Sequence, residues 1–532
     1  MLVLILGVFA VHRAAGQAAG DGTPSTADHG RILLVLPFDN RTGQPSLEWI
    51  REAAANLLSS RFASAGFAPM TRADRIYALD HLGLPQSFQP SRASSLKLAQ
   101  TLDADSIVVG SYSTDGTQIV AQAQVVDVPH LRMSAPLTAR GEMRDMISVF
   151  DSLAWRLTRQ LDPSFSGAEE TFIAAGKSLR LDAYEQYIRG ITEPDQAERL
   201  RHLQQAVKLS PDFGAAWMAL GREDYQDQQY DQAAQAFAKV DSDGPDGLEA
   251  GFYRGLSLLF SGGYPLAEQA FAQVARILPL AEVLNNQGVA VSRQGHDGTA
   301  LFVQAASADP NVPDYHFNLA VSLKRQGKTE AALNELAQCL KLRSSDSEAQ
   351  ALQADWKAPA VAQASAAGTD PAAMPDPLER IVRTFDAVAF RQASQMLDQM
   401  NETRLAALTP PERAQRLSLQ ARGYLDRGLL LEAERLYQSA IAEDGRVAEA
   451  HVGLALVRER AGNAADARTE AHAALELTPS ADAYLILCRL DLADNRLSEA
   501  RDDAGNALKL DSSSQAAQEL MRQVRKRTDQ SR

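Results

Sequence analysis

Aromatic residues, cysteines and basic charge are all scarce in this chain of 532 residues. Aromatics make up 6%, there are two cysteines, and 53 Lys and Arg stand against 67 Asp and Glu, a net charge of −14. The shortage of basic charge argues against a nucleic-acid binder, which needs a basic footprint. Cys339 and Cys488 are too few for a disulfide scaffold or a cysteine-based zinc site. We expect both to be small core residues.

The remaining composition is that of an ordinary folded protein, with 45% apolar and 23% charged residues. Its length suggests about three to five structural units. The charge is uneven, because residues 31–163 hold 13 basic and 13 acidic residues, whereas residues 164–532 hold 39 basic and 52 acidic residues. The acidity therefore belongs to the second part of the chain.

Long hydrophobic runs are also absent, apart from the ten apolar residues LVLILGVFAV at 2–11. This run is too short to span a bilayer, which takes about 20 residues. The small residues Ala14 and Gly16 after it fit a signal-peptide cleavage site, although no Lys or Arg precedes the run. We expect a signal peptide at 1–16 and a flexible leader at 17–30. A buried amino-terminal strand or helix and an uncleaved anchor are the alternatives.

Residues 31–163 alternate between strand-like and helix-like segments. Bounded apolar runs and helical spacing predict strands over 31–38, 67–70, 106–112 and 118–127, and helices over 47–65, 94–102 and 143–161. Asp115-Gly116 is a strong hairpin signal between the last two strands. The order predicts an α+β domain, a mixed sheet with helices on one face.

Three segments of this domain resemble the bacterial TolB amino-terminal-like domains, which are related to the CsgG and FlgO group. They are LVLPFDN at 34–40, LAQTLDADSIVVGSY at 98–112 and AQVVD at 123–127. The resemblance implies a bacterial cell-envelope setting and a non-catalytic domain that docks on other proteins. CsgG is a lipoprotein pore, whereas this chain has no cysteine before Cys339 that could be acylated.

Two series of small residues repeat in the second part with a period close to 34 residues. Alanines recur at intervals of 34, 33 and 32 and then of 34 and 33 residues, at Ala233, Ala267, Ala300 and Ala332, and at Ala433, Ala467 and Ala500. The second series precedes these alanines by five residues and comprises Gly262, Gly295, Gly327, Gly428, Gly462 and Asn495. Such a period is the helix–turn–helix signature of tetratricopeptide repeats (TPR). Gly or Asn ends the first helix in a left-handed conformation, and alanine lets the two helices approach closely.

We therefore expect an all-α TPR superhelix in two arrays, one at 164–351 and one at 378–532. Residues 352–377 are rich in Ala and Pro and read as a linker. Degenerate repeats are expected near 184–210 and 381–400. The segment after Asp511 is expected to form a helix that caps the stack.

Enzyme signatures are missing or incomplete, so we expect no catalytic residues, cofactor or metal. Gly176-Lys177-Ser178 lacks the first glycine of a phosphate-binding loop, because Thr171 stands there. In Asp241–Asp246 a proline occupies the third ligand position of a calcium loop. No small-molecule substrate is indicated.

Stacked TPR units expose a concave groove lined by the first helix of each unit. The resemblance to TPR proteins implies that an Asn at the sixth position of that helix can bind a ligand backbone, and Asn286 and Asn318 match it. The same inner face is expected to carry Arg222, Tyr225, Asp314, Lys324 and Arg422. These residues predict a groove for an extended peptide or helix. The alternative is that the two Asn only stabilise their repeats.

Three hypotheses of function follow. The first is a non-enzymatic, exported scaffold of the bacterial envelope, periplasmic or peripherally associated with an envelope complex, which binds proteins and no nucleic acid. The second is a signalling regulator of the type attached to adenylate-cyclase or DNA-binding domains, lacking its effector because the α/β domain begins about 30 residues in. The third is an enzyme in the α/β domain, whose polar candidates Asp39, Asn40 and Asp127 are explained by turns at strand ends.

Overall fold

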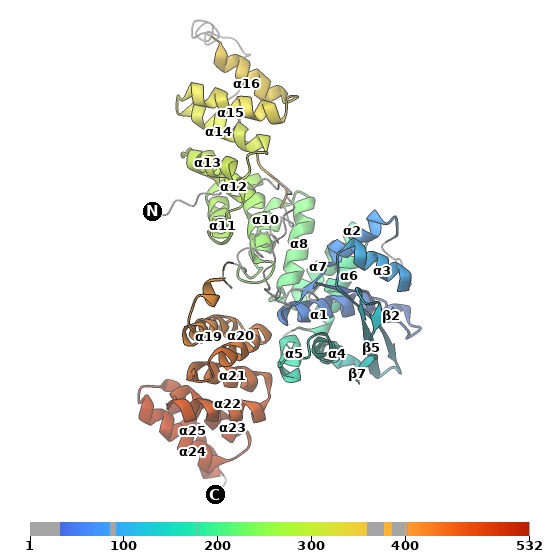
Figure 1. Cartoon of the computed structure of the whole chain (residues 1–532), viewed down its shortest axis with the longest axis vertical. Coiled ribbons are helices and arrows are strands. Elements are labelled where there is room, and N and C mark those ends of the chain that lie inside the picture. The colour runs from blue at the N-terminus through green and yellow to red at the C-terminus, as the bar shows by residue number, and fades with distance from the viewer. Residues whose placement is uncertain are drawn as a thin grey trace, which may run out of the picture.

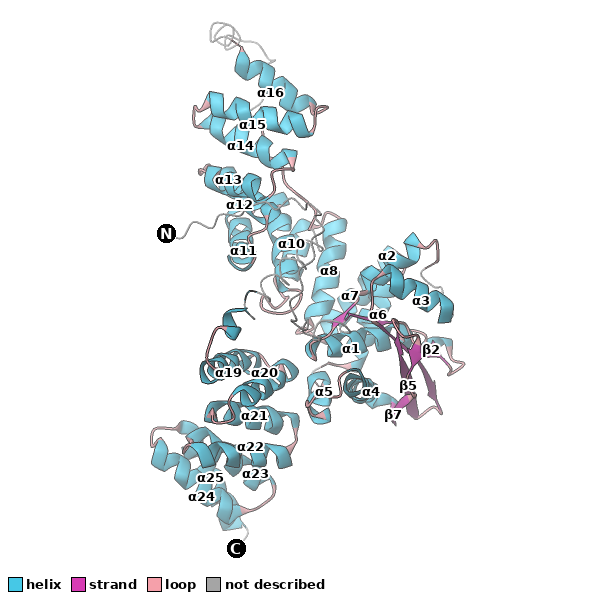
Figure 2. Cartoon of the chain, in the orientation of Figure 1, coloured by secondary structure: helices cyan, strands magenta, loops and turns pink. Residues whose placement is uncertain are grey.

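The computed structural model describes residues 32–85, 92–177, 179–358, 377–385, 400 and 403–530. The expected signal peptide and leader lie outside these residues. A sheet domain comes first and helical hairpins follow, as the sequence predicts (Figure 2). Within the described ranges, no helix combines the length and the apolar character that crossing a bilayer requires.

The sheet is mixed and follows the order β3-β1-β4-β5-β6, with β2 added to β4 and β7 to β5. Its strands are β1 (Ile32–Val35), β2 (Asp39–Asn40), β3 (Ala68–Pro69), β4 (Ser106–Thr114), β5 (Gln118–Asp127), β6 (Arg132–Met133) and β7 (Leu137–Glu142). β1 pairs in parallel with β3 and β4, and β4 forms an antiparallel hairpin with β5. Gly116 turns this hairpin with a φ of +102°, and Asp115 accepts the backbone N–H of Gln118 over 2.8 Å.

Helices cover both faces of this sheet, so the expectation of helices on one face was wrong. They are α1 (Ile50–Ser64), α2 (Arg72–His81), α3 (Arg92–Thr101) and α4 (Met146–Leu161), with short 3-10 turns at Pro45–Leu47 and Met143–Asp145. Leu33 and Val35 pack in the core formed with α1 and α4. Leu34 and Leu36 pack in a second core with α2 and α3. Because β1 alternates between two buried faces, it is a continuous apolar run.

The first array is a series of helical hairpins that climbs away from the sheet domain (Figure 1). Its helices are α6 (Leu181–Thr192), α7 (Gln196–Leu209), α8 (Gly214–Gln226), α9 (Tyr230–Phe237), α10 (Gly247–Phe260), α11 (Tyr264–Ile277), α12 (Ala281–Arg293), α13 (Thr299–Ala308), α14 (Pro313–Arg325), α15 (Thr329–Leu342) and α16 (Ser347–Lys357). The hydroxyl of Tyr184 on α6 donates to the carbonyl of Ala53 on α1 over 3.0 Å. The first hairpin is thus anchored to the sheet domain.

The second array lies below the first array in the view of Figure 1, beside α5 and on the same side of the sheet domain. It consists of α19 (Pro410–Asp426), α20 (Leu430–Glu443), α21 (Ala448–Ala461), α22 (Ala464–Leu477), α23 (Ala481–Ala493), α24 (Leu497–Leu510) and α25 (Gln515–Gln530). It packs against α5 (Glu169–Gly176), which follows the sheet domain. Buried Glu434 on α20 accepts the Ala168 backbone N–H over 3.3 Å and lies 2.7 Å from Arg458 of α21. The two arrays therefore do not form one continuous superhelix.

The repeat positions behave as the spacing predicts, with one exception. Each glycine of the series, and Asn495, adopts a positive φ. The alanines of the series are fully buried except Ala300, which is exposed. In that repeat Gly298 takes the close approach instead, since a Cβ there would lie 2.7 Å from the carbonyl oxygen of Gly288. The close contact therefore falls three residues after the left-handed Gly295 instead of five, and the sequence series did not reveal this.

Two expectations around the linker need correction. Helix α16 runs on to Lys357 with Leu352 and Trp356 buried, so the linker does not begin at 352. Residues 381–385 are extended rather than part of a degenerate helical repeat. The remainder of that expected repeat, apart from Met400, lies outside the described residues. The extended segment has hydrogen-bond partners in the first array, and these replace the bonds of a helix.

Candidate functional site

An extended stretch of the chain, residues 377–385, lies across the first helices of successive repeats in the first array. We call this stretch the strap, and the face formed by α10, α12, α14 and α16 the first groove. Side-chain amides bind the strap backbone. Asn318 donates to the carbonyl of Arg380 over 2.8 Å and accepts its N–H over 2.7 Å. Asn286 does the same with Val382 over 2.7 and 2.9 Å.

These amides are buried within helices, where their own backbones are already hydrogen-bonded. Asn285, Asn286 and Asn318 are each 0% exposed. Asn285 links the other two, since its amide donates to Asn286 over 3.2 Å and its oxygen accepts from Asn318 over 2.8 Å. A buried amide without partners destabilises a fold. The strap completes this network, so it belongs to the fold as well as to the groove.

Arg380 of the strap enters an acidic socket. Its guanidinium donates to Asp346 over 2.6 and 2.9 Å, to Asp314 over 2.9 Å and to Glu348 over 2.8 Å. It also lies 3.6 Å from the ring centre of Phe317. Burial lowers the pKa of Arg380, but these hydrogen bonds outweigh burial and raise it. The bond from Arg380 in turn lowers the pKa of Asp346. The socket selects a planar cation.

Glu379, the preceding strap residue, enters a basic socket. Its carboxylate is almost fully buried and contacts Arg325 and the hydroxyl of Ser292, while Arg293 Nε lies 3.3 Å from its Oε2. Arg293 also donates to the carbonyl of Glu379 over 3.1 Å, and Arg325 donates to that of Pro377 over 2.9 Å. A buried carboxylate needs such pairing, because desolvation otherwise destabilises it strongly.

The far end of the strap makes apolar contacts. Ile381, Val382 and Phe385 pack against the core of α10 to α14. The ring of Phe385 lies 5.5 Å from that of Phe252 and 6.4 Å from that of Tyr253. Such offset aromatic contacts add to the energy of burial. The strap thus crosses the first groove from α16 back to α10.

The structure brings together three of the seven residues predicted to line a groove. Asn286, Asn318 and Asp314 all contact the strap. The others are paired elsewhere: Arg222 with Glu249, Tyr225 with the rings of Tyr230, Tyr253 and Phe260, Lys324 with Thr329 and Trp356, and Arg422 with Asp426. Binding of a foreign peptide by any of them stays a prediction.

Sequence reasoning missed the sockets and the strap. The residues not foreseen are Asn285, Arg293, Phe317, Arg325, Asp346, Glu348 and the strap residues Glu379 and Arg380. One signal was available, because Arg293 and Arg325 stand at the same distance before Gly295 and Gly327. A basic residue at an equivalent inner position of two neighbouring repeats indicates a shared anion site. The local sequence of the strap does not predict that it lies on the groove.

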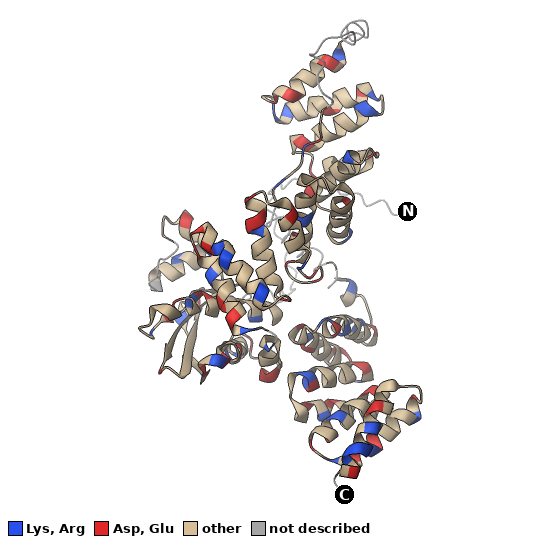
Figure 3. Ribbon diagram, turned by 180° about the vertical axis from the view of Figure 1, so that it is seen from behind, with Lys and Arg blue, Asp and Glu red and all other residues tan. Residues whose placement is uncertain are grey.

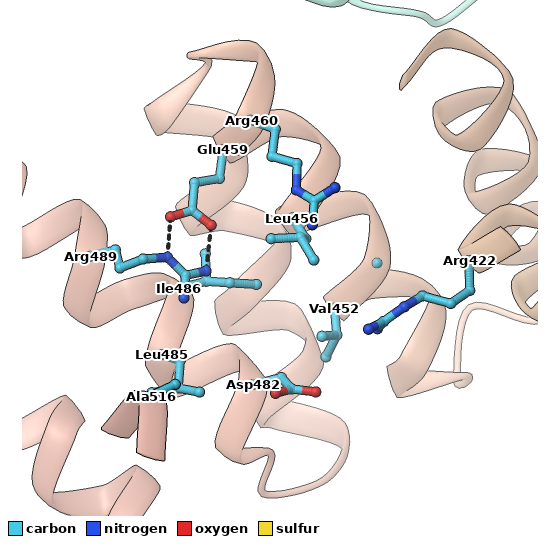
Figure 4. Close-up of a pocket in the computed structure, with 11 residues that line it drawn as sticks. Arg422, Val452, Leu456, Glu459, Arg460, Asp482, Leu485, Ile486, Arg489 and Ala516 are labelled. Atoms are coloured by element: carbon cyan, nitrogen blue, oxygen red, sulfur yellow. Dashed lines mark hydrogen bonds and ion pairs between the residues drawn. The ribbon is translucent and has the colours of Figure 1, made fainter. Parts of the chain in front are cut away.

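The second array carries an open cavity of about 540 Å³ on the corresponding face (Figure 4). Val452, Leu456, Leu485 and Ile486 supply its apolar lining, and Arg422, Arg460 and Asp482 its charges. Glu459 and Arg489 form a pair at its edge, with both hydrogen bonds at 2.6 Å. This second groove lacks the amide clamp. Asn286 stands nine residues before the left-handed Gly295. The residues nine positions before Gly462 and Asn495, which are the equivalent turns of the second array, are Gly453 and Ile486.

The described residues show no cluster of three or more His, Cys, Asp or Glu side chains that could hold a metal ion. Cys339 and Cys488 are buried and unpaired, as their helical contexts suggested. Burial raises the pKa of both thiols to about 11. Thiols with such a pKa stay protonated and unreactive at neutral pH.

Comparison with known proteins agrees with the repeats. Residues 200–247 and 418–482 match a family described as tetratricopeptide repeat. No curated protein matches the chain. Similar solved structures include MamA 41-end from Desulfovibrio magneticus RS-1, at 21% identity over 34% of this chain and 100% of that chain, with a TM-score of 0.28.

Two further structures are similar over parts of the chain. YrrB, described as a TPR protein with an unusual peptide-binding site, is 16% identical over 38% of this chain and 99% of its own, with a TM-score of 0.29. The LpoB carboxy-terminal domain from Salmonella enterica is 21% identical over 23% of this chain and 87% of its own, with a TM-score of 0.20. The family match and the alternation of helices, left-handed turns and buried alanines show that the chain contains tetratricopeptide repeats.

Proposed function

We propose that this protein is a non-enzymatic scaffold that binds other proteins through its two arrays. The observation that carries the proposal is the strap, whose backbone is held by Asn286 and Asn318 and whose charges enter two sockets. A surface that binds an extended segment of its own chain has the chemistry to bind one from another protein. TPR arrays are suited to this, because stacking leaves an extended concave face.

The second groove is a surface that an outside partner reaches without displacing a described part of the chain. Its apolar floor and charged edges match the composition of protein interfaces, which combine an apolar centre with a polar rim. Lys and Arg are interspersed with Asp and Glu along both arrays (Figure 3). This mixture of charges favours protein partners over nucleic acid.

The test is affinity capture from the native host with the full chain as bait. Leu456→Glu places a charge on the half-buried floor of the second groove, and Leu477→Glu makes the same change at an exposed site on α22. A partner of the groove is lost with Leu456→Glu and retained with Leu477→Glu, provided that both variants unfold at the same temperature as the wild type. Identical capture by both variants contradicts the role of this groove.

We further propose that the scaffold is exported and works in the bacterial envelope, with residues 31–163 as a TolB-like docking domain. The apolar run at 2–11 and the strand motif at 34–40 support this proposal. Fractionation of the native host, with an antibody against the arrays, is the measurement. The expected product is a chain shortened by residues 1–16 in the envelope fraction. Full-length protein that remains in the cytosol would falsify the export.

A further inference from the structure

The strap occupies the first groove as a ligand would. Its contacts fall into two classes, those that bind the backbone of the strap and those that bind its side chains. The five bonds between the amides of Asn285, Asn286 and Asn318 and the strap backbone would form with any extended segment. The two sockets, in contrast, read side chains of opposite charge at adjacent positions. Leu378, Arg383 and Thr384 are exposed, and none of them enters a socket.

We propose that the first groove is a receptor for an extended protein segment of the pattern Glu-Arg-aliphatic-aliphatic, with an aromatic residue three positions later. The strap is its resident ligand, and a partner segment of the same pattern must displace it. This inference rests on the proposed scaffold function. It specifies the class of segment that binds the first groove and identifies the strap as the element that controls access to it.

The two sockets give the pattern its order. The basic socket of Arg293 and Arg325 takes only an acid, and the acidic socket of Asp314, Asp346 and Glu348 takes only a base. An inverted Arg-Glu pair would place like charges together in a largely buried site, and that is strongly unfavourable. The order of the charges also sets the direction in which the segment runs across the helices.

Tethering makes the strap an effective competitor. A segment joined to its own groove binds at an effective concentration in the millimolar range when the linker spans the distance. For a segment whose intrinsic Kd is about 10 µM, competition from the strap weakens binding of a free peptide by on the order of 10²-fold. A weak or non-matching segment is therefore excluded, and a partner needs a close match or a high local concentration.

Release of the strap does not require the second array to leave the sheet domain. That array has its own attachment, because Glu434 contacts the backbone of Ala168 and the side chain of Arg458. The amide of Gln438 also donates to the carbonyl of Ser166 over 3.1 Å. The first groove can thus open while the rest of the described fold keeps its contacts.

The experiment measures binding of a fluorescent peptide of residues 377–385 to the full chain. Arg380→Glu puts a carboxylate among three others and expels the strap without a substitution in the groove. Val382→Pro is a second way to release it, because it removes the N–H that Asn286 accepts. Arg383→Glu is the matched control, since this arginine of the same strap is exposed and enters neither socket, and its ring contact is with Phe260.

We expect the peptide to bind Arg380→Glu and Val382→Pro at least tenfold more tightly than it binds the wild type or Arg383→Glu. Adding Asn286→Ala and Asn318→Ala to the Arg380→Glu chain should abolish binding. A peptide with Glu379 and Arg380 interchanged should bind at least tenfold more weakly than the native peptide.

Three outcomes overturn the inference. Equal binding to wild type and Arg380→Glu means that the strap is no barrier. Equal binding of the interchanged peptide means that the groove does not recognise the order of the two charges. Absence of binding to Arg380→Glu, when the strap amides of that variant exchange freely with solvent, means that the groove does not accept the segment from outside. None of these outcomes affects capture of a partner by the second groove, so the scaffold proposal is tested separately.

Discussion

The side chain of Asn318 and the backbone of Arg380 exchange two hydrogen bonds, at 2.8 and 2.7 Å, across a separation of 62 residues. Asn286 and Val382 repeat the arrangement one helical repeat away. Each amide therefore acts towards the strap as a neighbouring strand would, satisfying both a donor and an acceptor of one residue. Four predictions about this and other contacts can be tested.

Loss of the amide clamp should expose the strap. In the wild type the N–H groups of Arg380 and Val382 are hydrogen-bonded to Asn318 and Asn286, so both should be protected from hydrogen exchange. We expect Asn286→Ala with Asn318→Ala to accelerate exchange of these amides at least tenfold, measured by mass spectrometry of strap peptides. Gln326→Ala, which alters a more exposed side chain after α14, should leave the rate unchanged. Unaltered exchange in the double variant would contradict the clamp.

The attachment of the second array should depend on Glu434. This buried carboxylate joins Arg458 and the backbone before α5. Glu434→Ala leaves both partners desolvated and removes an ion pair, so we expect the free energy of unfolding to fall by about 3 kcal/mol. Urea denaturation of the full chain is the measurement. Glu476→Ala, at an exposed site in the same array, should change it by less than about 0.5 kcal/mol. A similar effect of both variants would exclude a special role for Glu434.

Stability of the second array should depend on pH through Asp503. Burial, followed by the nearby carboxylates of Asp491 and Asp502, raises its pKa from 3.8 to about 7. Between these values the folded chain holds a proton that the unfolded chain releases. The resulting stability is fully present below about pH 4 and is lost as the pH rises through 7.

Asp503→Asn removes this titration. Its advantage in free energy of unfolding over the wild type should therefore grow between pH 5 and pH 8, by on the order of 1 kcal/mol after allowance for partial exposure. Chemical denaturation at the two pH values measures it. Exposed Asp529→Asn is the control and should show no such growth. A constant difference for Asp503→Asn would refute the raised pKa.

Two glycines of the second array should respond in opposite directions to alanine. Gly462 ends α21 at a φ of +93°, a conformation that costs an L-residue roughly 1–2 kcal/mol. Gly505 lies inside α24, and a Cβ there would meet only the methyl carbon of Met521 at 4.0 Å. We expect Gly462→Ala to lower the melting temperature and Gly505→Ala to raise it, because alanine favours the helix by roughly 0.5–1 kcal/mol. The same sign for both would show that backbone conformation does not decide the outcome.

The repeats were predictable because their signals are local. A glycine at a left-handed turn and an alanine at a close helix contact recur with each hairpin, so Gly462 and Ala467 take the places expected of them. Ala300 is the exception, because in that repeat a small residue two places earlier, Gly298, makes the close helix contact instead. Helices on both faces of the sheet were missed, although β1 reads as a continuous apolar run, the pattern of a strand buried on both sides.

The grooves were only partly predictable. Asn286 and Asn318 could be singled out by their place in the repeat, but an amide on a helix does not reveal what it binds. Arg422 was grouped with them by sequence, and it lies instead at the cavity of the second array. The contacts of Arg380 with Asp314, Asp346 and Glu348 join segments that no repeat relates.

The sequence by itself therefore determined the α+β domain and the helical repeats, since periodicity and turn chemistry act over a few residues. Only the tertiary structure decided that the strap lies on the first groove, that α5 receives the second array and that the second groove stays open. These depend on pairing of charges and amides between residues tens to hundreds of positions apart, such as Glu434 with Ala168. Local sequence preferences do not predict such pairs.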